Sequence, residues 1–456
     1  MGDYNPFNLT GDPFVDTGIA ALCVLENKNN VDEIEIDLLK NVIDEVSELY
    51  ITNIWKKHCH GMIFPNHGKM FNPSLSQNVI ERKQKIKKYL NKLCEGISQF
   101  NDYGDCIACG RRNSTRQINK SEFPLLGSGS FLNCFSYASE GVNICDTCLF
   151  CTQFVPIASK KVGGRILLLH SNKFEIMKYW VHDTVRDAQN QLHFKTITGL
   201  HVPDNYTNPQ NAIFELLSKI ILDYEENWYE MNPSITFYYY TNYNQNPDLD
   251  IIYFPDEIFR FLAQIKESNF FSEWRKIVIK GYINVKKEDM DQEMKYKNKK
   301  NQVYLHLLKK ESILRYFINF KEKKVLGPWK LVELYLMEVR KMEKERIGAI
   351  KKLGDKISEY IQKTNDTKRI KQLETAKNYS SLRNVFRFIE KKMISEEYGE
   401  PLFTFDEYVT LLFPEGSWWR ETLDLLLFRI YENLHQYLVE NKLISVEEEL
   451  ETNEVS

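Results

Sequence analysis

The chain has 456 residues, 43% of them hydrophobic and 13% aromatic, and carries a formal net charge of −3 at pH 7. This length is enough for two to three domains with an ample core, and no stretch approaches the roughly 20 apolar residues of a membrane span. Nine cysteines, an odd number, and the lack of an apolar signal before residue 20 argue against a secreted disulfide framework. We therefore expect a cytoplasmic protein with reduced cysteines and no membrane partner.

The first 80 residues combine helical patterns with turns. The turn signal Asp12-Pro13 precedes an apolar run. We expect this run to form a helix whose N-cap is Asp16 or Thr17. Apolar residues then recur at the helical period over 34–55.

The stretch 61–74 is irregular, with two Pro, two Gly and two Asn in fourteen residues. This composition predicts an exposed loop. A further helix, with Lys and Arg on its outer face, is expected over 79–100.

Two cysteine pairs are the most informative feature of the chain. Cys106-x-x-Cys109 is followed by Gly110, and after a gap of 35 residues comes Cys145-x-x-Cys148. Two C-x-x-C turns brought together form a tetrahedral four-sulfur cage, which suits structural zinc and leaves no open position for water or substrate. We predict zinc at these four residues and a small subdomain, about 104–152, inserted between and around the pairs.

Other interpretations of the cysteines remain open at this point. The alternatives to zinc are four buried thiols without metal and an iron–sulfur cluster. Cys151 follows Cys148 at the same spacing as Cys148 follows Cys145, so it could replace Cys145 or Cys148 as a ligand. Cys23, Cys59, Cys94 and Cys134 are expected to be small core residues. The run Gly127-Ser128-Gly129 between the pairs lacks the ending of a nucleotide-binding loop and is interpreted as a turn.

The rest of the chain divides into a mixed part and a helical part. Strands are predicted at 165–170, 192–198, 235–241 and 251–254, and helices at 173–187, at 211–230 and from 256. From about 300 the pattern becomes long amphipathic helices, including 329–364 and 417–441. The predicted fold class is α+β, with a mixed N-terminal domain, 1–280, and a C-terminal helical bundle, 281–456.

Charge is distributed unevenly along the chain. Residues 280–400 carry 30 Lys and Arg against 18 Asp and Glu, a net of +12, whereas residues 401–456 carry 3 against 12, a net of −9. The basic block is a candidate nucleic-acid surface. The alternative is an ordinary solvated face of helices.

Catalytic motifs are not evident in the sequence. There is no G-x-S-x-G, H-E-x-x-H or strand-linked G-x-G-x-x-G. His58 and His60, with His67 nearby, form the one local histidine cluster. A zinc-dependent nuclease would use such residues beside a cysteine cage, but no carboxylate constellation for a two-metal site accompanies them. We expect a protein that is not an enzyme.

The order of motifs resembles one family. The resemblance is carried by four features: the opening Gly11-Asp12-Pro13-Phe14-Val15-Asp16-Thr17-Gly18, the Pro65-Asn66 loop, the two cysteine pairs, and Gly127-x-Gly129-x-x-Leu132-Asn133 between those pairs. Through these features the chain resembles the C-x-x-C…C-x-x-C large subunits of type I CRISPR interference complexes (Cascade), of the I-B group. The resemblance covers residues 10–155. Beyond them the chain resembles the family only in layout.

The resemblance implies a subunit without chemistry of its own. Such a subunit lies near the 5′ handle of the CRISPR guide RNA, beside the backbone and handle-binding subunits of Cascade. It reads the protospacer-adjacent motif on double-stranded target DNA, helps to open the duplex and stabilise the R-loop, and supports recruitment of the helicase–nuclease. Its C-terminal bundle would contact the displaced single strand.

Two groups of residues fit this role. In the 61–74 loop, Asn66, Lys69 and Asn72 can hydrogen-bond base edges, Gly68 allows close approach, and Phe64, Met70 or Phe71 can wedge a base step. Beside the first cysteine pair, Arg111, Arg112 and Arg116 can grip the RNA handle or a DNA backbone. The alternatives are an ordinary surface turn and a solvated loop. At the level of the whole chain, the alternatives are a zinc-dependent nuclease and a zinc-stapled scaffold without nucleic acid.

Overall fold

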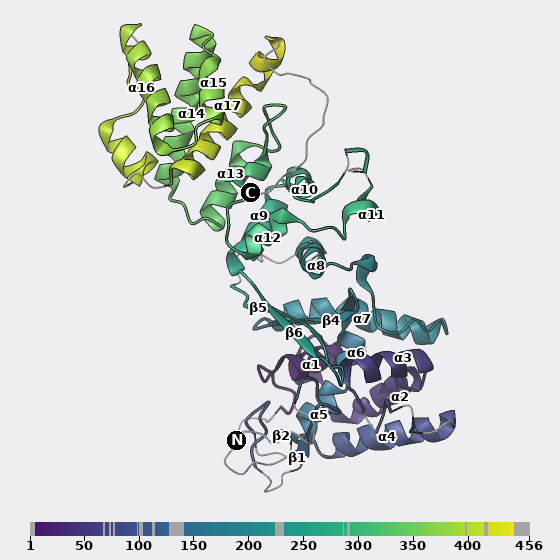
Figure 1. Ribbon diagram of the computed structural model, residues 1–456. Coiled ribbons are helices and arrows are strands. Elements are labelled where there is room, and N and C mark those ends of the chain that lie inside the picture. Colours follow the sequence, from purple (N-terminus) through teal and green to yellow (C-terminus); the bar gives the residue numbers. More distant parts are fainter. Residues whose placement is uncertain are drawn as a thin grey trace. The chain divides into compact units, whose positions relative to one another are not determined.

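The computed structural model describes residues 5–66, 69–72, 74–75, 78–97, 99, 104–111, 115–126, 141–223, 232–285, 287–289, 292–396, 399–414 and 418–441. The chain forms two compact units (Figure 1). Unit 1 comprises Met1–Tyr224 and Met231–Asp256, and unit 2 comprises Glu225–Glu230 and Glu257–Ser456. The division after Asp256 lies earlier than the predicted boundary at 280.

Unit 1 begins with a buried helix, α1 (Pro13–Leu25). Its N-cap is Asp12, whose carboxylate accepts hydrogen bonds from the backbone N–H groups of Phe14 and Val15 at 2.9 and 3.0 Å. The expected cap at Asp16 or Thr17 was therefore wrong. Asp16 is instead buried inside the helix, where its carboxylate bonds to His170 at 3.0 Å.

Helices make up most of the regular secondary structure of unit 1. The α-helices after α1 are α2 (Leu39–Tyr50), α3 (Asn53–His58), α4 (Val79–Glu95), α5 (Asp146–Thr152), α6 (Val155–Ala158), α7 (Phe174–His193) and α8 (Pro209–Asp223). Shorter elements are η1 (Val31–Glu33), η2 (Ile36–Leu38), the π-helical η3 (Cys59–Ile63) and η4 (Pro203–Asn205). The helix predicted over 34–55 is thus divided among η2, α2 and α3, because Thr52 caps a new helix.

Unit 1 contains a four-stranded antiparallel sheet. Its strands follow the order β3 (Lys160–Val162), β4 (Arg165–Ser171), β5 (Ile235–Thr241) and β6 (Asp248–Phe254). In the register of β4 and β5, Leu169 lies opposite Phe237. Helices α1 and α7 pack against β4, which buries Leu167, Leu168 and Leu169. A separate pair, β1 (Thr115–Ile118) with β2 (Val142–Cys145), is also antiparallel.

One predicted strand, 192–198, is not present. Helix α7 continues to His193, and the backbone N–H groups of Thr198 and Gly199 bond to the Gln191 side-chain carbonyl rather than to a neighbouring strand. The residues predicted as a strand form the end of α7 and a loop that is bonded to Gln191.

Unit 2 is helical. Its α-helices are α9 (Asp256–Glu267), α10 (Phe271–Lys280), α11 (Glu293–Tyr296), α12 (Gln302–Leu308), α13 (Trp329–Glu338), α14 (Lys344–Thr364), α15 (Lys368–Glu374), α16 (Tyr379–Ser395) and α17 (Trp419–Glu440). Smaller elements are η6 (Lys287–Asp289), η7 (Leu314–Phe317), the hairpin of β7 (Ile318–Asn319) and β8 (Lys324–Val325), and the π-helical η8 (Glu407–Leu412).

The helices α14 to α17 form a bundle, seen at the green to yellow end of Figure 1. The long helix predicted over 329–364 is two helices, since the backbone turns between α13 and α14 with Lys341 at a φ of +53°. Gly354 does not interrupt α14. A Cβ at this position would lie 2.8 Å from Cβ of Arg429, so the glycine allows α17 to approach closely.

The structure confirms the predicted fold class, with mixed helices and small sheets, a cysteine cluster within 106–148 and a helical C-terminal region. No helix in the described part of the chain is both long enough and apolar enough to cross a lipid bilayer.

Candidate metal centre

The first cysteine pair lies in a tight loop before β1. The backbone N–H of Gly110 donates to the carbonyl of Cys106 at 2.7 Å, and the N–H of Cys106 donates to the carbonyl of Arg111 at 3.0 Å. Gly110 has a φ of +67°, a conformation that favours glycine. The loop is also fixed to β2, because the N–H of Ile107 bonds to the Asn143 carbonyl at 2.9 Å.

The second pair spans the junction of β2 and α5. Cys145 is the last residue of β2 and the N-cap of α5, and its sulfur accepts the backbone N–H of Cys148 at 3.5 Å. The first turn of α5 therefore sets the distance between Cys145 and Cys148.

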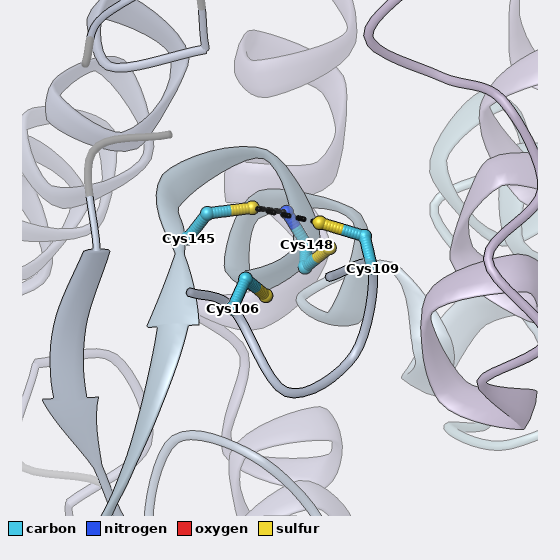
Figure 2. A group of neighbouring side chains, drawn as sticks. All are labelled: Cys106, Cys109, Cys145 and Cys148. Carbon is cyan, nitrogen blue, oxygen red and sulfur yellow. Dashed lines mark hydrogen bonds between the residues drawn. The ribbon is translucent and has the colours of Figure 1, made fainter. Parts of the chain in front are cut away.

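The four sulfur atoms point into one small volume (Figure 2), and all lie within 4.8 Å of one another. Cys106, Cys145 and Cys148 are buried, and Cys109 is half-buried. The sulfurs of Cys109 and Cys145 are 3.7 Å apart. A tetrahedral zinc ion with bonds of about 2.3 Å needs ligand sulfurs about 3.8 Å apart. The donor set and its spacing thus fit a tetrahedral thiolate-bound metal.

Crowding of the sulfurs changes their acidity in opposite directions. Hydrogen bonds from Cys106, Cys145 and Cys148 lower the pKa of Cys109 far below its usual value. Hydrogen bonding to Cys106, Cys109 and Cys145, together with burial, raises the pKa of Cys148 far above it. Against the opposing effect of Cys109, the contacts with Cys145 and Cys148 lower the pKa of Cys106 to about 7. The group therefore favours thiolates at Cys109 and Cys106 and resists ionisation of Cys145 and Cys148. A bound divalent cation would remove that resistance.

An ion pair joins the strand β1 to the start of α5. The Arg116 guanidinium donates to the Asp146 carboxylate, with 2.7 Å between Nη2 and Oδ2, and Asp146 is only 2% exposed. Register places Thr115 opposite Cys145 and Arg116 opposite Ile144. Asp146 was not among the predicted site residues, although its position directly after Cys145 is a signal that could have found it.

Cys151 is buried on α5 and is not a member of the four-sulfur group. It faces α1, where a Cβ on Gly18 would lie 2.0 Å from the Cys151 carbonyl oxygen. Burial raises the pKa of its thiol. Cys134 and the Gly127–Gly129 run lie outside the described residues.

The arginines beside the first pair are held by the protein itself. Arg111 donates to the backbone carbonyls of Pro6 and Asn8 at 3.1 and 3.3 Å, and Arg116 is bound to Asp146. Arg112 lies outside the described residues. The structure therefore assigns Arg111 and Arg116 a stabilising contact each, whatever else they bind.

The 61–74 stretch differs from the expected exposed loop. Phe64, Met70 and Phe71 are fully buried, and the Phe64 and Phe71 rings stack with centroids 5.8 Å apart. These side chains belong to the core, so the proposed wedge into a base step was wrong.

The polar members of this stretch have separate surroundings. Asn66 is exposed, with a φ of +58°. Lys69 pairs with Glu122 at 2.5 Å, and the Asn72 side chain accepts the backbone N–H of Ser74 at 2.8 Å. Gly68 lies outside the described residues.

The histidine cluster does not form a second metal group within the described residues. Nδ1 of His58 accepts the backbone N–H of Leu200 at 3.4 Å. Burial lowers the pKa of both His58 and His60, so both are neutral at pH 7. His67 lies outside the described residues.

Comparison with known proteins gives one match. A family model described as CRISPR-associated protein (Cas_CXXC_CXXC) matches residues 99–160, the segment that holds both cysteine pairs. No curated protein and no solved structure matches the chain. The matched segment is similar to CRISPR-associated proteins with paired C-x-x-C motifs, which supports a role in CRISPR systems.

Proposed function

We propose that the chain is the large subunit of a type I CRISPR complex, of the I-B group, and that it acts without chemistry of its own. The observation that carries the proposal is the closed four-cysteine group inside the segment 99–160 that matches the CRISPR-associated family. Four sulfur ligands leave no coordination position for a substrate. A metal held there stabilises the fold rather than reacting.

The metal is proposed to be zinc. Cys106, Cys109, Cys145 and Cys148 would hold it, and it would supply structural stabilisation by joining the loop before β1 to the β2–α5 junction. The short distances between the sulfurs favour a single zinc ion over a larger cluster.

The proposed partners are the guide RNA, the backbone and handle-binding subunits of Cascade, the target duplex with its displaced strand, and the helicase–nuclease. The exposed Asn66, and the partly exposed Lys69, support a motif-reading role for this surface. In RNA-guided recognition, pairing reads the sequence while the protein reads a short motif and the backbone.

The test is the electrophoretic mobility of a motif-bearing duplex with the guide-bound backbone subunits, with and without this chain. The expected result is a shift that depends on both the motif and the chain. Zinc content of the purified chain, measured by mass spectrometry, is expected to be one ion per chain. A duplex shift that is the same with and without the chain would overturn the proposed role, and cleavage of DNA by the chain alone would replace it with the nuclease alternative.

A further inference from the structure

A groove in unit 2 combines an aromatic floor with a basic rim. It has a volume of about 460 Å³ and lies between α16 and the chain that leads into η8. Phe386, Phe403 and Tyr408 form its floor, and the Phe403 and Tyr408 rings lie 4.9 Å apart, tilted by 31°. The hydroxyl of Tyr408 is held by Tyr379 at 2.6 Å. Phe405 stands at the edge and is 77% exposed.

Three exposed cations follow one face of α16 along this groove. Arg383, Arg387 and Lys391 are four residues apart, so they succeed one another at steps of about 6 Å. None of them has an ion-pair partner among the described residues. The single carboxylate of the lining, Glu390, accepts the backbone N–H of Leu402 at 2.8 Å. The groove therefore fits an anionic segment that also carries apolar side chains.

The sequence contains a segment with this composition directly after α17. Residues 442–456 carry Glu447, Glu448, Glu449, Glu451 and Glu454 against a single Lys442. Leu443, Ile444, Val446 and Leu450 are interspersed among them. Branched aliphatic side chains fit an aromatic floor, and the glutamates match the three cations on the rim.

The end of α17 lies near the same end of the bundle as the end of α16. Tyr437, in the last turn of α17, bonds to Asn365 just after α14 at 2.5 Å. Met393, in the last turn of α16, lines a common pocket with Lys363 in the last turn of α14. From Lys391 to Arg383 the helix rises only about 12 Å, whereas fifteen extended residues span up to about 50 Å.

We infer that residues 442–456 bind in cis to the groove between α16 and η8, with their glutamates against Arg383, Arg387 and Lys391. A segment tethered at this distance acts at an effective concentration in the millimolar range. Any other polyanion must displace it before reaching these cations. The inference does not rest on the proposed CRISPR role or on the metal.

The experiment uses a fluorescent peptide with the sequence of residues 442–456. Its anisotropy is measured with the full chain and with a chain that ends at Asn441 and keeps every described residue. The peptide should bind the shortened chain and bind the full chain at least tenfold more weakly. Replacing Glu447, Glu448 and Glu449 by Gln in the full chain should free the groove as the truncation does.

Substitutions in the groove identify the binding surface. In the shortened chain, Phe405→Ala and Arg387→Glu should each weaken peptide binding about tenfold or more. Lys392→Glu, on α16 outside the groove, should change peptide binding less than threefold. Equal peptide binding by the full and shortened chains would overturn the inference, as would equal effects of Arg387→Glu and Lys392→Glu. If only the full chain self-associates, residues 442–456 bind the groove of a second copy and the inferred cis contact is overturned.

Discussion

The Arg116 guanidinium and the Asp146 carboxylate form an ion pair whose acidic member is almost completely buried, one residue after Cys145. Arg116 comes from β1 and Asp146 from the first turn of α5. A Cβ on Gly96 would lie 2.1 Å from Oδ2 of Asp146, so the end of α4 approaches the same carboxylate. The pair thus fixes the strand, the helix and the second cysteine pair relative to one another.

Removing the arginine should therefore destabilise unit 1. Arg116→Ala leaves a buried carboxylate without its partner, and loss of one member of a buried pair costs about 3–5 kcal/mol. Urea denaturation of the variant should show this loss. Lys85→Ala, which breaks the exposed pair with Glu81, should cost less than about 1 kcal/mol. Similar losses from both substitutions would show that the Arg116–Asp146 contact contributes little.

Loss of one cage sulfur should remove the metal and much of the stability. Cys109→Ser should purify without a bound ion and with a melting temperature lowered by at least 10 °C, because a structural zinc site supplies folding free energy directly. Cys94→Ser is the matched control, since Cys94 lies outside the four-sulfur group, and should keep both the ion and the melting temperature. A metal-free Cys109→Ser chain as stable as the parent would contradict a stabilising role for the ion.

The N-cap of α1 should make stability depend on pH. Burial raises the pKa of Asp12 to about 6, against the opposing effect of hydrogen bonds from the Val15 and Phe14 N–H groups. The folded chain thus holds this proton more tightly than the unfolded chain, whose carboxyl titrates near pH 4. The stability from this group is complete below pH 4 and is lost as the pH rises through 6.

Asp12→Asn keeps a capping oxygen but carries no charge at any pH. Compared with the parent, the variant should have the same free energy of unfolding at pH 4 and one up to about 2 kcal/mol higher at pH 7. Denaturation curves at the two pH values measure the difference. Asp44→Asn, at an exposed position on α2, is the control. A gain for Asp12→Asn that is equal at both pH values would rule out titration of Asp12 as its cause.

Two glycines in helices should respond oppositely to the same substitution. Gly18→Ala places a methyl group against the Cys151 carbonyl and should cost about 1–3 kcal/mol by overpacking α1 against α5. Gly348→Ala, on the exposed face of α14 with no atom near the added carbon, should gain about 0.5–1 kcal/mol from helix propensity. Thermal denaturation measures both. A stable Gly18→Ala variant would mean that the contact relaxes at little cost.

The cysteine pairs of the candidate site could be predicted from the sequence. The conformation of a C-x-x-C turn followed by a glycine depends on only five consecutive residues. The two pairs come together in one four-sulfur group, as predicted. The ion pair of Arg116 with Asp146 was not predictable in this way, because it depends on the register of β1 with β2. Pairing between distant strands leaves no periodic mark in the sequence.

Errors in the fold have the same origin. Composition alone suggested an exposed loop at 61–74, yet Phe71 is buried against Tyr50, with ring centroids 4.9 Å apart. The single helix predicted over 329–364 is likewise two helices, and the packing of Gly354 against α17 cannot be seen in the local pattern. In each case a tertiary contact outweighed a local preference.

The position of the two cysteine pairs also sets an order of events during synthesis. The turn at Cys106 and Cys109 leaves the ribosome first, and by itself it offers a metal only two sulfurs. The other two arrive with β2 and the first turn of α5, and only then is the proposed zinc fully enclosed. Completion of the metal site therefore waits for the second pair, and a chain that matures without zinc should be less stable, as expected for Cys109→Ser.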